Sequence, residues 1–100
     1  MRHALTDRRR RVERQLFDVY ARLARARAEL DVVEQQLAAL EEMADEARVR
    51  MLVAETPLAE REWREAQRHA EVIARTRDAG RAEIAQLEGT RDALLAKLVG

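Results

Sequence analysis

The side chains in this 100-residue chain that could carry chemistry are arginines, carboxylates and two histidines. The chain contains neither Ser nor Cys, so serine and thiol nucleophiles, thiolate metal sites and disulfides are excluded. His69 follows Glu65 by four residues, but a paired-carboxylate metal site needs Glu-x-x-His twice with further glutamates. There is no Ca²⁺-binding loop and no Gly-rich phosphate loop. We therefore predict no enzyme activity, no metal and no cofactor.

Charge is unevenly distributed along the chain, although the formal net charge is zero. Residues 1–27 hold nine Arg against three carboxylates, whereas residues 28–62 hold ten carboxylates against three Arg. The basic run could bind phosphates, but consecutive residues point around a whole helix and no aromatic platform for bases flanks them. We interpret this run as a solvated or protein-docking end. Nucleic acid is a less favoured partner, and an acidic membrane surface is less favoured still.

Apolar residues spaced alternately by four and three positions predict the elements that carry these charges. One series runs from Val12 to Met51 and a second from Ala59 to Leu98, and both are typical of a helix-packing seam. The first predicts a helix over about 6–54 with Thr6 as N-cap, and the second a helix over about 57–98. Thr56 followed by Pro57 is a typical helix start, so the turn is expected at about 54–57.

Two long helices joined by so short a connection must run antiparallel. Pairing residues whose numbers sum to 110 places seam positions of the two helices opposite one another, with large side chains mostly facing small or medium ones. We therefore predict an all-α fold in which residues 1–100 form a single antiparallel coiled-coil hairpin. The alternative is a hairpin that opens so that two chains pair.

Arg77 and Arg91 fall on seam positions of the second helix. We expect each to lay its stem along the seam and send its head to the edge. Arg77 would reach Glu29 or Glu34, and Arg91 would reach Tyr20. In the alternative interpretation, the two arginines specify the register or receive a partner's carboxylate.

A second, thinner set of apolar residues follows helical spacing outside the seam. Its largest members are Phe17, Tyr20 and Leu95, and most of the others are Ala. Ala also suits a solvated helix face, but the aromatic side chains favour self-association. We predict a homodimer that forms a four-helix bundle, in which small residues permit close approach.

These observations favour a non-enzymatic protein–protein interaction or adaptor module that binds an unidentified partner protein. The alternative is a transcription-linked regulator that contacts RNA polymerase, a sigma factor or nucleic acid through the Arg-rich end or the acidic turn end. A structural rod without a recognition role is a third possibility. No stretch approaches the roughly 18 apolar residues of a membrane span and no signal-peptide pattern is present, so we expect a cytoplasmic protein. Arg is used almost to the exclusion of Lys, which suggests a bacterial source. The candidate partner-binding residues are Arg8, Arg10, Arg11, Arg14, Phe17, Tyr20, Arg77, Arg91 and Leu95.

Overall fold

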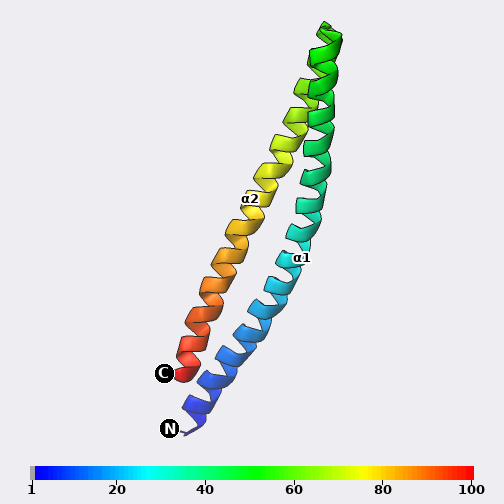
Figure 1. Cartoon of the computed structure of the whole chain (residues 1–100). Helices are drawn as coiled ribbons and strands as arrows, with labels where there is room; N and C mark the ends of the chain where they lie inside the picture. The colour runs from blue at the N-terminus through cyan, green and yellow to red at the C-terminus, as the bar shows by residue number, and fades with distance from the viewer. Residues whose placement is uncertain (1) are drawn as a thin grey trace. The chain divides into compact units, whose positions relative to one another are not determined.

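The computed structural model describes the backbone of residues 2–100 and the side chains of residues 4–100. Over this range the chain forms two helices and no strand: α1 spans Arg2–Ala54 and α2 spans Pro57–Val99. The two helices are in contact and form a hairpin (Figure 1). The expectation of an all-helical hairpin is therefore confirmed.

The start of α1 differs from the expectation. The helix begins at Arg2, so Thr6 lies inside it and does not cap it, and its first turn contains no acidic side chain. Two physical reasons account for the earlier start. Residues 2–5 include neither Gly nor Pro, and Arg, Ala and Leu are good helix formers. Leu5 also lies seven residues before Val12, so the apolar spacing continues past Thr6.

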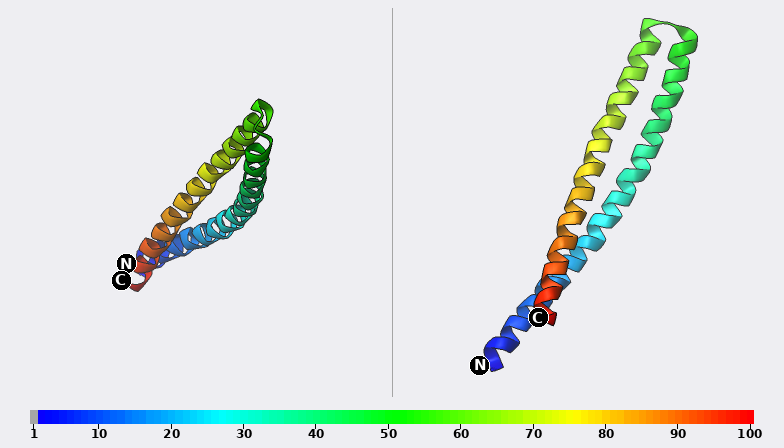
Figure 2. Two further views of the ribbon diagram at one scale, coloured as in Figure 1. Left: turned by 45° about the horizontal axis from the view of Figure 1, so that its top comes forward. Right: turned by 60° about the vertical axis from the view of Figure 1, so that its left-hand side comes forward.

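The hairpin divides into two packing units, each built from a segment of both helices. Unit 1 comprises residues 1–29 and 80–100, and unit 2 comprises residues 30–79. In unit 1 the beginning of α1 lies beside the end of α2, whereas unit 2 contains the turn between the helices (Figure 2).

Unit 1 has a core of large aliphatic side chains. Leu23 is completely buried, and Val12, Leu16, Val19 and Leu94 form one cluster with it. Partly buried side chains from α2 pack against this cluster, namely Ile84, Leu87 and Leu98. The cluster and the side chains packed against it include both members of three layers that the sequence predicts: Val12 with Leu98, Leu16 with Leu94, and Leu23 with Leu87.

Unit 2 has a core of smaller side chains. Its buried apolar residues are Leu37 and three alanines, Ala47, Ala59 and Ala70. The larger seam side chains, such as Trp63 and Ile73, are only partly buried. Because hydrophobic stabilisation follows the apolar area removed from water, the layers of unit 2 in which Ala is the buried member contribute less than a Leu layer of unit 1.

The turn is built from two residues with distinct backbone roles. Glu55 adopts a left-handed conformation, with φ of 50°, and its N–H donates to the carbonyl of Met51 at 3.0 Å. Thr56 then caps α2, because its Oγ1 accepts a hydrogen bond from the N–H of Ala59 at 3.2 Å. Pro57 occupies the first helical position, where its missing N–H costs nothing. The predicted start of α2 is thus confirmed.

Candidate functional site

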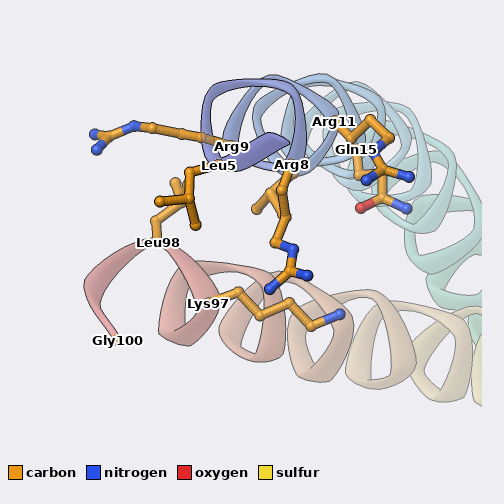
Figure 3. A pocket seen from close by; sticks show the side chains of 9 residues that line it. Leu5, Arg8, Arg9, Arg11, Gln15, Lys97, Leu98 and Gly100 are labelled. Carbon is orange, nitrogen blue, oxygen red and sulfur yellow. The ribbon is translucent and has the colours of Figure 1, made fainter. Parts of the chain in front are cut away.

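Part of the arginine run gathers in a cleft of unit 1. The cleft has a volume of about 620 Å³ and lies between the beginning of α1 and the end of α2. Figure 3 shows the side chain of Arg8 reaching toward α2, where Lys97 approaches the cleft from the opposite helix. The basic cleft, as we call this feature, is lined by Leu5, Arg8, Arg9, Arg11, Val12, Gln15, Lys97, Leu98 and Gly100.

The run therefore does not act as a single surface. Arg8 and Arg11 are three residues apart, so they lie on one side of α1, and both line the cleft. The guanidinium of Arg9 points away from it (Figure 3) and pairs with Glu13, Nε to Oε1 at 3.2 Å. Arg10 and Arg14 are exposed and do not line the cleft.

Lys97 is a cation of this cleft that the sequence analysis did not single out. A signal for it existed, since the register that pairs Leu16 with Leu94 places Lys97 across from the segment around Arg11. Lys97 also lies in the last turn of α2, where a cation interacts favourably with the carbonyl end of the helix dipole.

A second surface of unit 1 carries the aromatic residues. Phe17 is 78% exposed, and Tyr20 and Leu95 are also exposed. Each of them directly follows a seam residue in the sequence. In a pair of antiparallel helices, the residues that follow seam residues on both helices lie on the same side of the seam. An ion pair between Arg27 and Glu88, Nη2 to Oε2 at 3.6 Å, joins two other positions of this kind across the helices. We call the surface formed by Phe17, Tyr20 and Leu95 the aromatic face.

The small residues of the outer stripes are exposed within the described chain. Among the described residues, nothing lies within 4 Å of the position that a Cβ on Gly89 would occupy. Packing within the hairpin therefore does not require a glycine at this position. The outer alanines of unit 1 are likewise exposed, at Ala21, Ala24, Ala28, Ala82, Ala93 and Ala96.

The seam arginines are partly buried, but the partners that the structure gives them differ from those expected. The Arg77 side chain is 26% exposed, and its Nε donates to Oδ1 of Asp78 at 3.0 Å. Arg91 is 24% exposed and donates in the same way to Asp92 at 3.0 Å. The physical reason is proximity, because a carboxylate on the next residue of the same helix needs no reach across the seam.

Electrostatics keep Arg91 charged. Its hydrogen bond to Asp92 raises the pKa of the guanidinium above the ordinary value, and the charges of Asp92, Glu88 and Tyr20 add to this effect, whereas partial desolvation opposes it. Arg91, like any arginine, is a cation at neutral pH. The expected partner Tyr20 contributes to this pKa only through the charge that its phenolate carries at high pH.

An apolar groove at the turn is a further surface that the sequence analysis missed. This tip groove, of about 410 Å³, is lined by Val49, Arg50, Val53, Ala54, Thr56, Leu58, Ala59 and Glu62. Val53 is 81% exposed, and Val49, Leu52 and Leu58 are also largely exposed. The available signal was a pair of apolar residues off the seam, Val49 and Val53, which lie about two turns and one turn before Pro57.

Titratable residues elsewhere do not assemble into a metal-binding arrangement within residues 4–100, where no group of three His, Asp or Glu side chains could hold an ion. His69 and Glu65 are both exposed. Over the same range, every buried side-chain polar atom has a hydrogen-bond partner.

Comparison with known proteins adds no relative. No protein-family model, no curated protein and no solved structure matches the chain. Neither described helix is apolar over a length that could cross a membrane. Fold and surfaces together define a class: a two-helix hairpin protein with an exposed aromatic face, a basic cleft and an apolar tip groove.

Proposed function

We propose that this chain is a non-enzymatic, self-associating protein–protein interaction module that works in the cytoplasm. The observation that carries the proposal is the exposure of the aromatic face. Fully burying a side chain such as Phe contributes about 1.5–3 kcal/mol, and the structure leaves Phe17 in water. Large exposed side chains grouped on one face are typical of interaction sites.

Self-association through the aromatic face would produce the four-helix bundle. In that arrangement the faces of two copies pack together, so that each Phe17 leaves water. The small outer residues on either side support this geometry, because they let helices approach closely. Glu13, Arg27 and Glu88 on the same side of the seam would lie at the rim, where charged residues remain solvated.

Sedimentation equilibrium over a range of concentrations tests self-association. We expect a concentration-dependent dimer that Phe17→Ser combined with Leu95→Ser converts to a monomer of unchanged helix content. Met43→Gln is the matched control, since it removes an exposed apolar side chain from unit 2. Dimerisation that survives the double substitution would contradict the aromatic face as the interface.

The basic cleft favours a second candidate function. The convergence of Arg8, Arg11 and Lys97 supports a transcription-linked regulator that contacts RNA polymerase, a sigma factor or nucleic acid. Affinity capture from nuclease-treated host lysate tests this function. Recovery of one stoichiometric transcription protein, lost when Arg8, Arg10 and Arg11 are replaced by Glu, is the expected result. Cell fractionation of the same host tests the cytoplasmic location.

A further inference from the structure

The basic cleft combines cations with apolar side chains. Arg8, Arg11 and Lys97 line it, and none of them forms an ion pair with a residue that the structure describes. Leu5, Val12 and Leu98 contribute apolar surface to the same cleft. A complementary occupant must therefore combine carboxylate or other anionic groups with protruding apolar side chains.

The tip of unit 2 has this combination. Val53 and Leu58 are largely exposed there, Glu62 lines the tip groove, and Glu55 occupies the turn itself. Residues 41–62 hold seven carboxylates against three Arg. At the level of the packing units the contrast is larger: the sequence gives unit 1 a net charge of +5 and unit 2 a net charge of −5.

We propose that the basic cleft of one copy receives the tip of a second copy. The proposal rests on the self-association proposed above and adds a second contact to it. Apolar tip side chains such as Val53 would enter between Leu5 and Leu98, while Glu55 and Glu62 would face Arg8, Arg11 and Lys97. Because cleft and tip are different surfaces, the contact is heterologous: the copy that uses its cleft keeps a free tip, and the copy that uses its tip keeps a free cleft. Such contacts propagate into open chains unless they close into a ring.

The physical character of this contact follows from its side chains and charge. The contact relies on a few exposed apolar side chains and on surface charge pairs, which contribute about 0.2–1 kcal/mol each. Its affinity is therefore weak. The opposed charges are largely exposed, and salt at 1 M shortens the screening length to about 3 Å, so the contact is lost at high salt.

Paramagnetic broadening between two copies tests the proposal directly. The chain has no Cys, so Arg61→Cys, an exposed position of unit 2 outside the tip groove, gives a single attachment site for a nitroxide. This spin-labelled copy is mixed with an isotope-labelled copy that carries no nitroxide. We expect loss of amide signal intensity around Leu5, Arg8 and Lys97 of the isotope-labelled copy at low salt, and recovery of these signals at high salt.

Charge reversal supplies the variants and the control. Arg8→Glu with Arg11→Glu in the isotope-labelled copy should abolish the broadening. Arg14→Glu with Arg25→Glu changes the total charge equally but leaves the cleft intact, so broadening should persist. A compensating exchange uses a spin-labelled copy with Glu55→Arg and Glu62→Arg. Mixed with the isotope-labelled copy that carries Arg8→Glu and Arg11→Glu, it should restore the broadening of the cleft signals.

Three results would overturn the proposal, and they differ in whether the proposed self-association is kept or lost. Broadening confined to the aromatic face would show that self-association is lateral only. Absence of any intermolecular broadening, together with a monomer in sedimentation, would contradict both the further contact and self-association. Signals of the cleft that change with an added DNA duplex but not with the spin-labelled copy would identify nucleic acid as the occupant.

Discussion

Leu23 and Phe17 lie less than two helical turns apart on α1, yet their environments are opposite. Leu23 is the one large side chain that the described hairpin removes completely from water, whereas Phe17 is 78% exposed. The spacing of the seam determines this difference, because Leu23 occupies a seam position and Phe17 follows one. Residue type alone would not separate the two, because Leu and Phe are both among the residues most often fully buried.

We expect Leu23→Ala to lower the free energy of unfolding by about 3 kcal/mol, because it removes apolar contacts and leaves a cavity in the unit 1 core. Phe17→Ala should change the stability of the monomer by less than about 0.5 kcal/mol. Urea unfolding followed by circular dichroism, at concentrations where the chain is monomeric, measures both. A large loss from Phe17→Ala under these conditions would mean that the residue packs within the hairpin.

Glu55 is the second residue with an unusual local state, since it adopts a left-handed backbone conformation. That conformation costs a residue with a Cβ about 1 kcal/mol, and Gly avoids the cost. We therefore expect Glu55→Gly to raise the free energy of unfolding by up to about 1 kcal/mol. Glu55→Ala is the control, because it removes the carboxylate but keeps the Cβ. Equal stabilisation by both variants would show that the carboxylate, and not the backbone, carries the cost.

At the level of the helices, the sequence predicted what burial imposes and missed what depends on three-dimensional neighbours. The seam could be read because each of its positions, from Val12 to Leu98, is at least partly removed from water. The helix start at Thr56 and Pro57 could be predicted because helix capping depends on local sequence. The partners of Arg77 and Arg91 could not, since several carboxylates lie within reach of a long side chain.

The surfaces show the same division. Exposure of the aromatic face follows from helical spacing, which is a local property. The basic cleft needs Lys97 from α2 beside Arg8 from α1, and the start of α1 at Arg2 brings Leu5 into the helix that lines it. The arginine run can therefore be recognised from the sequence of α1 alone, whereas the cleft cannot be predicted without the packing of α2 beside it.

Gly89 lies within α2, about three turns before its end, where its lack of a side chain weakens the helix. Because the position of its absent Cβ is open, we expect Gly89→Ala to raise the free energy of unfolding of the monomer by about 1 kcal/mol. Thermal unfolding at low concentration measures the gain. Ala93→Gly, on the exposed side of the same helix, should produce a loss of similar size. A destabilising Gly89→Ala would mean that another part of the hairpin approaches this position.

For the molecule as a whole, the balance between stability and a single pairing arrangement depends on the two seam arginines. Each interrupts an otherwise apolar series, and each keeps a neighbouring carboxylate as its partner. A seam of uninterrupted Leu, Val and Ala would be more stable but would suit several alignments, including an opened hairpin in which two chains pair. A polar residue at one seam position is a known device for fixing register and oligomeric state at some expense of stability.

We therefore predict that Arg77→Leu and Arg91→Leu each raise the free energy of unfolding, by about 1 kcal/mol, because a partly buried guanidinium is replaced by an apolar side chain. The double variant should also become heterogeneous in oligomeric state. It should form dimers that the aromatic-face substitutions Phe17→Ser and Leu95→Ser no longer dissociate. Urea unfolding and sedimentation velocity measure the two effects separately. Unchanged or lowered stability would refute the idea that the arginines exchange stability for specificity. Raised stability with an unchanged, single oligomeric state would show that the remaining seam, with its alternation of large and small layers, already fixes the register.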